Sequence, residues 1–199
     1  MTDERPRPAT DKRTADKRTA ALDAAIHLVG TEGLRALTHR RVDAIAGVPA
    51  GSTSNYFRTR QALVEGVLDR LLEQDRVQLA AIGSAMPGDA CELEDLMHGY
   101  VMFVTGDDLV RTRARFAMFV EAMATPDLRA GVETRRSELR GWIGTVLAGL
   151  GVDDSATAAR VLIDYLDGLI LHRCTSHDDG PDPRDGVARM VRMLLPTAG

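Results

Sequence analysis

A run of small polar side chains near the N-terminus is the part of this sequence best suited to contacting another molecule. Residues 50–56 are Ala-Gly-Ser-Thr-Ser-Asn-Tyr, so hydroxyl, amide and phenol groups follow one another closely. Such groups exchange hydrogen bonds with phosphates and base edges, and their small size suits a helix that enters a DNA groove. Because they are mediocre helix formers, a polar loop is the alternative. We interpret the run as a helix that contacts DNA.

The neighbouring residues predict the elements that position this run. Thr38 is a good N-cap for a short helix that ends at Gly47, where a positive φ carries no Cβ penalty. Pro49 stands at or beside the first position of the next short helix, which we expect to extend to about Phe57. Two short helices joined by a turn with glycine form a helix-turn-helix.

Helical periodicity dominates the rest of the chain, and we predict no strand. One helix is expected from about residue 14 to just before Gly33, and another over residues 61–82. Five more are expected at about residues 91–105, 108–124, 126–150, 155–176 and 183–195. The expected fold is all-α with about nine helices. It comprises a disordered arm (1–13), a three-helix head (14–60) and a helical body (61–199).

The charges of the chain are unevenly divided. Its 199 residues sum to a formal net charge of −4, which by itself argues against binding nucleic acid. Residues 1–60, however, hold 11 Lys and Arg against 7 Asp and Glu, whereas residues 61–199 hold 14 against 22. A basic head on an acidic body indicates a phosphate-contacting module joined to a part with another task, with chance as the alternative.

Composition excludes several classes of protein. No apolar run approaches the roughly 18 residues of a membrane span, and residues 1–20 lack the apolar segment of a secretory signal. Cys91 and Cys174 are too few for a disulfide framework and are expected to be thiols. We therefore expect a cytoplasmic protein without a membrane segment.

Metal and catalytic motifs are incomplete in this sequence. One cluster near the end of a helix could suggest a metal site, but it contains no CxxC, HExxH or calcium-loop motif. No phosphate-binding loop or nucleophile elbow is present either. We therefore expect no metal, no cofactor and no enzymatic activity. The cluster consists of His172, Cys174, His177, Asp178 and Asp179.

Residues 38–48 (Thr-His-Arg-Arg-Val-Asp-Ala-Ile-Ala-Gly-Val), 51–57 and 60–63 resemble the helix-turn-helix of the tetracycline-repressor (TetR) family of transcriptional regulators. The resemblance is specific over about residues 14–72. It implies a helical homodimer whose three-helix head binds double-stranded DNA, with residues 50–56 as the recognition helix. It also implies a body that binds a small-molecule effector and dimerises. Pro49 departs from the family pattern, which often has a capping Ser there, so the cap must come from elsewhere.

Roles at the DNA follow from side-chain chemistry. Thr38 and Ser52 can donate to phosphates at helix N-termini, and Tyr56 can donate to another phosphate. Arg40 and Arg41 can contact the backbone or a guanine edge, and Arg60 resembles the basic phosphate clamp of the family. The best candidates for base edges are Thr53, Ser54 and Asn55. The predicted DNA-binding residues are Thr38, Arg40, Arg41, Ala50, Gly51, Ser52, Thr53, Ser54, Asn55, Tyr56 and Arg60.

Aromatic residues and methionines gather in the body, where the resemblance implies an effector pocket. Such a lining with a few polar groups is typical of a small-molecule cavity, although for each single residue a plain core is the commoner explanation. The predicted ligand-binding residues are Met97, Tyr100, Phe103, Arg115, Phe116, Phe119, Met123, Trp142, Asp164 and Tyr165.

The last two helices carry apolar residues at helical spacing, and the resemblance implies that these helices pair with those of a second copy. The predicted dimer interface consists of Val161, Leu162, Leu169, Val187, Met190, Val191 and Leu194. The resulting hypothesis is a repressor released from a palindromic operator by a small molecule. Two alternatives are a DNA-binding protein without an effector, acting architecturally or through protein partners, and a small helical enzyme.

Overall fold

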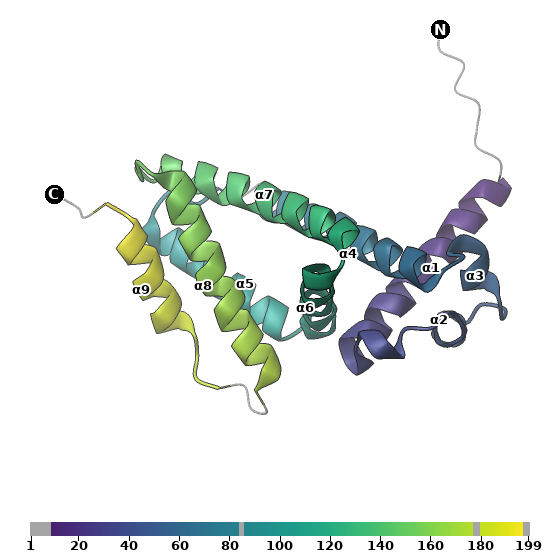
Figure 1. Ribbon diagram of the computed structural model, residues 1–199. Helices are drawn as coiled ribbons and strands as arrows, with labels where there is room; N and C mark the ends of the chain where they lie inside the picture. The colour runs from purple at the N-terminus through teal and green to yellow at the C-terminus, as the bar shows by residue number, and fades with distance from the viewer. Residues whose placement is uncertain (1–8, 84–85, 177–179, 197–199) are drawn as a thin grey trace, which may run out of the picture.

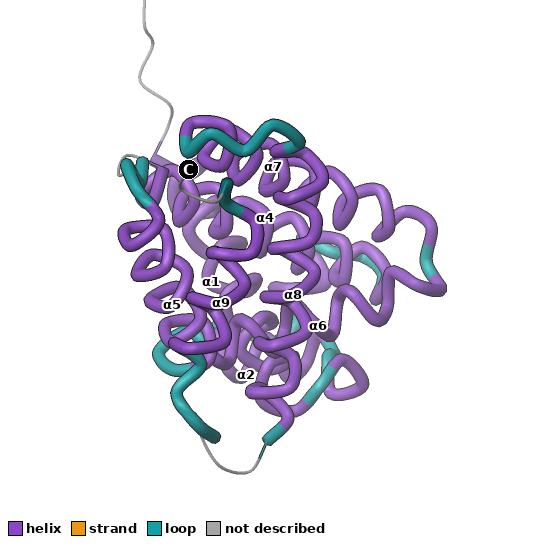
Figure 2. The backbone as a smooth tube through the Cα atoms, turned by 90° about the vertical axis from the view of Figure 1, so that its left-hand side faces the viewer, coloured by secondary structure: helices purple, strands orange, loops and turns teal. Residues whose placement is uncertain are grey.

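The computed structural model describes residues 9–83, 86–176 and 180–196, and all regular structure in these ranges is helical (Figures 1 and 2). The all-α prediction is thereby confirmed. The helices are α1 (Ala9–Glu32), η1 (Leu34–Ala36, a 3-10 turn), α2 (His39–Ala46), α3 (Ser52–Tyr56), α4 (Arg60–Gly83), α5 (Ala90–Thr105), α6 (Leu109–Ala124), α7 (Pro126–Gly149), α8 (Ser155–Thr175) and α9 (Arg184–Leu194).

The first helix begins earlier than the sequence predicts. α1 starts at Ala9, so residues 9–13, expected in a disordered arm, are helical. Lysine and arginine are good helix formers, and no breaker follows Pro8, which explains the longer helix. Residues 1–8 lie outside the described residues.

The turn between α2 and α3 is built on two glycines with positive φ. Thr38 is exposed, and its hydroxyl accepts from the backbone N–H of Arg41 as the predicted N-cap of α2. Gly47 ends α2 with φ 64°, as predicted. Gly51 has φ 89°, which a right-handed helix cannot contain, so α3 begins at Ser52 rather than at residue 50.

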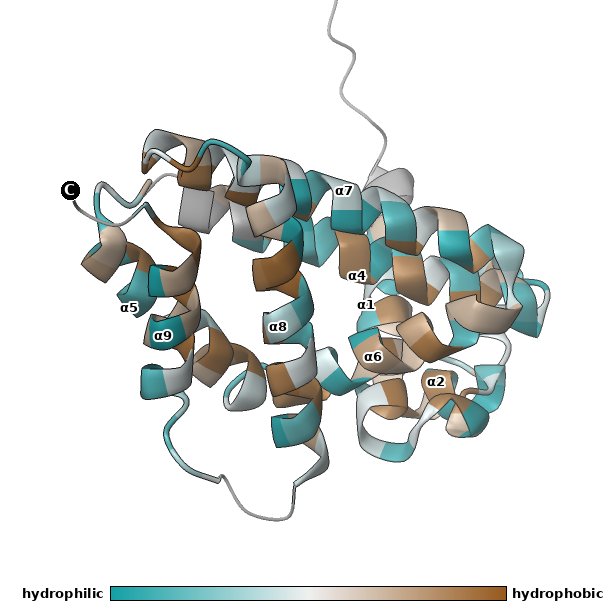
Figure 3. Ribbon diagram, turned by 60° about the vertical axis from the view of Figure 1, so that its left-hand side comes forward, coloured by the Kyte–Doolittle hydropathy of each residue, from teal (hydrophilic) through white to brown (hydrophobic). Residues whose placement is uncertain are grey.

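The head and the body lie at opposite ends of the molecule (Figure 1). α1, α2 and α3 form one end, and α5, α8 and α9 form the other. α4 and α7 are long helices that pack on one another, and α6 lies between the two ends. Figure 3 shows hydrophobic residues of α8 and α9 alternating with polar ones, as expected of amphipathic helices.

Two hydrophobic cores hold these helices together. The first joins α1, α2 and the start of α4 to α6 and the first turn of α7, with Leu28, Leu63, Met118 and Leu128 among its buried side chains. It therefore crosses the head–body boundary expected at residue 60. The second core lies wholly in the body, among α5, α7, α8 and α9.

α1 and α6 cross at very close range. A Cβ added to Gly30 would stand 2.0 Å from the backbone carbonyl oxygen of Val110. Only glycine permits this approach, and it brings the backbone of α6 directly against the last turns of α1.

Two sequence-based exclusions bear on the described residues. None of the described helices has the length and apolar character that a membrane span needs. Three members of the His/Cys/Asp cluster, His177, Asp178 and Asp179, lie outside the described residues. The absence of a metal site there stays a prediction.

Candidate functional site

A carboxylate from α2 holds the N-terminus of α3. Asp43 is 4% exposed and accepts hydrogen bonds from the backbone N–H groups of Gly51 (2.7 Å) and Thr53 (2.8 Å) and from the Thr53 hydroxyl (2.5 Å). Burial opposes the negative charge, but the hydrogen bonds from Thr53 and Gly51 outweigh it and hold the pKa of Asp43 below its ordinary value of 3.8. Asp43 therefore provides the cap that Pro49 cannot.

The middle of α3 faces solvent. Ser54 and Asn55 are exposed, and Ser52 is half-buried. The hydroxyls of Ser52 and Ser54 donate to the carbonyl oxygens of Pro49 (2.6 Å) and Gly51 (2.8 Å). A hydroxyl oxygen that donates its own hydrogen can still accept one from a base edge. These three residues therefore form the outward polar surface that the sequence predicts.

Thr53 is a correction to the predicted DNA-contacting set. It is fully buried, and its hydroxyl donates to Asp43, because it serves the cap rather than the surface. Ala50 and Gly51 are exposed but belong to the turn before α3 rather than to the helix. Tyr56 is half-buried against the first hydrophobic core.

The predicted cationic residues lie on α2 and at the start of α4, the helices before and after α3 in the chain. Arg40 is exposed on α2. Arg41 is also exposed and forms an ion pair with Glu32 at the end of α1. Arg60, at the start of α4, donates to the carbonyl oxygen of Leu34 at 3.0 Å. α2, which carries Arg40 and Arg41, lies at the same end of the molecule as α3 (Figure 1).

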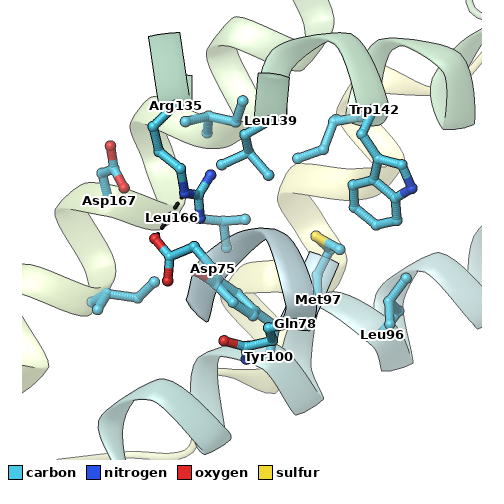
Figure 4. A pocket seen from close by; sticks show the side chains of 13 residues that line it. Asp75, Gln78, Leu96, Met97, Tyr100, Arg135, Leu139, Trp142, Leu166 and Asp167 are labelled. Carbon is cyan, nitrogen blue, oxygen red and sulfur yellow. Dashed lines mark hydrogen bonds and ion pairs between the residues drawn. The ribbon is translucent and has the colours of Figure 1, made fainter. Parts of the chain in front are cut away.

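The body contains a partly open cavity among α4, α5, α7 and α8 (Figure 4). It holds about 620 Å³ of space free of protein atoms, including the solvent at its mouth. Most of its lining is apolar, and the polar groups cluster around an Asp75–Arg135 ion pair. We call it the first compartment. Its lining is Asp75, Gln78, Leu96, Met97, Tyr100, Arg135, Leu139, Trp142, Ile143, Ile163, Leu166, Asp167 and Ile170.

A second compartment adjoins the first and shares six lining residues with it. It holds about 450 Å³, measured in the same way. Phe116 and Phe119 form an edge-to-face pair with centroids 5.8 Å apart, and the guanidinium of Arg136 lies 5.9 Å from the centroid of Phe119. Its lining is Tyr100, Arg115, Phe116, Phe119, Arg135, Arg136, Leu139, Ile163, Asp167 and Ile170.

Buried charges link the two compartments. The Asp75 side chain is 2% exposed, and its oxygens lie 2.7 Å from Nε of Arg135 and 3.4 Å from Nε of Arg115. Burial opposes the charge of Arg115, but Asp75, Tyr100 and Asp108 together outweigh it, and the pKa of the guanidinium is raised. Burial raises the pKa of the Tyr100 phenol, which keeps it neutral.

The same network reaches the start of α6. Arg115 and Arg111 both bond to Asp108, with nitrogen–oxygen distances of 3.2 and 2.8 Å. Arg111 also donates to the side-chain oxygen of Gln78, which lines the first compartment. Val110, next to Arg111, is the residue whose carbonyl meets Gly30 of α1. Polar contacts and backbone packing therefore connect the cavity to the head.

Six of the ten predicted ligand-binding residues line the cavity: Met97, Tyr100, Arg115, Phe116, Phe119 and Trp142. The other four predicted residues do not line it. Phe103 lies on an outer groove with Val77 and Arg111, because it points away from the α5 face that packs inward. Met123 is 73% exposed near the end of α6. Asp164 is exposed and paired with Arg136, and Tyr165 packs beside Gly186 of α9.

Sequence reasoning missed several polar groups of the cavity, chiefly Asp75, Arg135 and Asp167. Each interrupts an apolar stripe at helical spacing: Asp75 follows the buried Leu71 by four residues, and Arg135 precedes Leu139 by four. A charge on a buried stripe is the signal that could have found them, because burial of a charge requires a partner.

Part of the predicted dimer interface is buried within one chain. Leu162, Val187 and Val191 are each 0% exposed in the second core, so they are not available to a partner. Val161 is 43% exposed. Leu169, Met190 and Leu194 are half-buried. Leu171 and Met193, which the sequence reasoning did not include, are 42% and 75% exposed on α8 and α9.

Residues 88–197 match the family described as "Tetracyclin repressor-like, C-terminal domain". No curated protein matches the chain.

Solved structures with the same fold include two transcriptional regulators and one multidrug binding protein. A transcriptional regulator (RHA1_ro04179) from Rhodococcus sp. Rha1 is 22% identical (TM-score 0.72, 88% of this chain and 94% of that one). The multidrug binding protein EbrR complexed with ethidium is 26% identical (TM-score 0.70, 91% and 99%). A TetR family member (SCO1917) from Streptomyces coelicolor A3 is 27% identical (TM-score 0.69, 92% and 99%).

Proposed function

Because this chain belongs to the tetracycline-repressor family, whose members are DNA-binding transcriptional regulators rather than enzymes, we propose that it is a repressor released from its operator by a small molecule. In this proposal two copies bind a palindromic operator with their heads. An effector in the body cavity weakens that binding. The single observation that carries the proposal is the polar and steric connection from the cavity to α1.

The outward surface of α3 supports the DNA-binding part of the proposal. Asp43 fixes the helix, while Ser54 and Asn55 present hydroxyl and amide groups outward. An amide can accept from and donate to adenine in the major groove, and a hydroxyl can serve several bases. Arg40 and Arg41 would then contact the flanking phosphates, which position the helix without specifying sequence.

The cavity supports the proposal that a small-molecule effector binds in the body. The solved relative EbrR is a multidrug binding protein complexed with ethidium, and the chain here has a cavity in its body lined by aromatic and apolar groups. A protein that represses without an effector has no need of such a cavity, so its presence favours the ligand-responsive function over the alternative that acts only through protein partners.

The release mechanism would be a shift between two arrangements of the heads. A ligand that disturbs Gln78 or Asp75 also disturbs Arg111 and Arg115, which anchor the start of α6. Since α6 meets α1 at Gly30 with no spare space, a displacement of α6 would move the head. Operator DNA must then weaken ligand binding by the same factor by which the ligand weakens DNA binding.

Dimerisation would place the two heads about one helical turn of DNA apart, roughly 34–36 Å. We propose that the outer sides of α8 and α9 form the interface, since Val161, Leu171 and Met193 are apolar and exposed there. Leu169, Met190 and Leu194 border the same helices and are half-buried.

The DNA-binding proposal is tested by selecting bound fragments from a random duplex library. We expect a palindrome to be enriched, and its affinity to fall steeply between low and physiological salt because several phosphates are contacted. Asn55→Ala should weaken binding to that palindrome by about tenfold, corresponding to one lost base contact. Ser137→Ala, on the exposed side of α7, is the control and should bind as the wild type does. No enrichment, or equal affinity of the Asn55 variant, would contradict the proposal.

A further inference from the structure

Some of the polar groups that line the cavity are donors without a hydrogen-bond partner. Among the described lining residues, three buried side-chain nitrogen atoms have no hydrogen-bond partner: Nε of Arg136, Nε1 of Trp142 and Nε of Arg115. Of these, Nε of Arg115 still forms an ion pair with an Asp75 oxygen at 3.4 Å. Among the same described residues, no buried side-chain acceptor lacks a hydrogen-bond partner. A buried donor without an acceptor is costly, so a ligand that supplies acceptors gains the hydrogen bonds that the empty cavity lacks.

The charged residues of the lining also favour a ligand that supplies hydrogen-bond acceptors. Arg115, Arg135 and Arg136 face only Asp75 and Asp167 among the charged lining residues. Asp75 is already engaged by two guanidinium groups, and Asp167 bonds to Arg136 at 2.9 Å. Burial raises the pKa of Asp167, because desolvation disfavours its negative charge. Within the lining, three arginines stand against two carboxylates, and neither carboxylate is uncommitted. Arg115 and Arg136 also pair with carboxylates outside the lining, Asp108 and Asp164.

All three arginines line the second compartment. Arg115 and Arg136 line the second compartment and not the first, and they lie beside the Phe116–Phe119 pair. The first compartment is predominantly apolar and has only the indole N–H of Trp142 as an unpaired donor. The site thus has an apolar end and a cationic end.

We propose that the effector is an amphipathic organic anion, whose apolar ring system occupies the first compartment and whose carboxylate accepts hydrogen bonds from Arg115 and Arg136 in the second. This inference rests on the proposed function, because it assigns the cavity to an effector. It gives that effector the opposite charge to ethidium, the cation bound by the solved relative EbrR.

The test uses three probes with the same ring and different charge: 2-naphthoate, 2-naphthalenemethanol and 2-naphthylmethylammonium. Binding to the full-length protein is measured by calorimetry. The emission of Trp142, the single tryptophan of the chain, reports in parallel whether the first compartment is occupied. We expect naphthoate to bind about tenfold more tightly than the alcohol and the ammonium to bind most weakly, since a charge-assisted hydrogen bond is roughly twice as strong as a neutral one.

Two arginines one helical turn apart provide a matched pair of variants. The side chains of Arg136 and Arg140 are both 31% exposed, both pair with a carboxylate, and both have a buried Nε without a partner. Only Arg136 lines the cavity. Arg136→Gln should weaken naphthoate binding about tenfold and leave the alcohol unchanged. Arg140→Gln should change neither.

Arg115→Gln provides a second route to the same result, with its fold checked by circular dichroism. The proposal would be overturned if the three probes bound equally well, if the ammonium bound most tightly, or if no probe bound. It would also be overturned if neither cavity variant changed the affinity for naphthoate. Release of operator DNA by the ammonium probe would overturn only the assigned charge and leave the ligand-responsive repressor standing. Failure to bind any operator would instead remove the proposed function itself.

Discussion

At the scale of single residues, the head depends on polar groups that never reach the surface. Thr53 lies between two outward residues in the sequence, yet its hydroxyl is committed to Asp43. The neighbouring Ser54 and Asn55 are exposed. A pattern of small polar residues predicts a surface that contacts DNA but does not reveal which member caps the helix, because that depends on where α2 places a carboxylate.

Asp43→Ala should destabilise the protein by about 2 kcal/mol at neutral pH, because two backbone N–H groups and one hydroxyl lose a charged acceptor. The folded pKa of Asp43 is below the ordinary 3.8, so the contribution is complete above that pH and is lost as the pH falls through the folded pKa. The difference in unfolding free energy between the variant and the wild type, measured by urea unfolding, should therefore become smaller as the pH is lowered.

Asp69→Ala, at an exposed position on α4, is the control for this comparison and should cost less than about 0.5 kcal/mol. A cost for Asp43→Ala that is as small as this, or that grows as the pH is lowered, would show that the carboxylate does not stabilise α3.

At the scale of elements, the positions of the helices along the chain are largely predictable from the sequence. Which residues each helix packs against is not. Helical spacing, Thr38, Gly47 and the breakers after residue 82 locate the helices, and the body helices begin and end within about two residues of expectation. Helix orientation about its own axis was harder to predict. Phe103 and Tyr100 are both aromatic residues of α5, but only Tyr100 lines the cavity.

Periodicity fails here because it locates an apolar face without saying what that face meets. α6 carries residues of the first core on one side and cavity residues such as Phe116 on another. The buried Asp75 and Arg135 look like solvent-exposed charges in the sequence, since each becomes favourable only when the other is placed beside it.

Gly30→Ala should destabilise the protein by about 3 kcal/mol, at the upper end of the usual range for overpacking. The added Cβ would stand 2.0 Å from a backbone oxygen of Val110, so α1 and α6 would have to separate. Gly141→Ala is the control, because a Cβ at that helical position meets nothing within 4 Å. That variant should be neutral or up to about 1 kcal/mol more stable. Equal unfolding free energies for the two variants would refute the tight crossing.

At the scale of the whole molecule, the chain is a head and a body joined by packing as well as by sequence. The body has an acidic excess and the head a basic one, so we expect DNA to bind at the head. The apolar groups that remain exposed on α8 and α9 lie at the other end, where a second copy would leave both heads free (Figure 1).

Leu171→Glu should convert the protein from a dimer to a monomer at micromolar concentration, because it places a charge in the apolar centre of the proposed interface. Light scattering after size exclusion would give a mass near the 21.6 kDa of one chain instead of twice that value. Val77→Glu, on an exposed apolar residue of α4, should remain dimeric. A monomeric wild type, or a dimeric Leu171 variant, would exclude this interface.

The first core has a consequence for protein engineering. Regulators with new input–output combinations are commonly sought by splicing the DNA-binding segment of one protein to the sensing segment of another. In this chain a junction at residue 60 would separate Leu28 from Leu63 and Met118, which belong to one buried cluster. A functional hybrid would therefore need a matched α4 and α6 from the same parent as the head, or a redesigned seam between them.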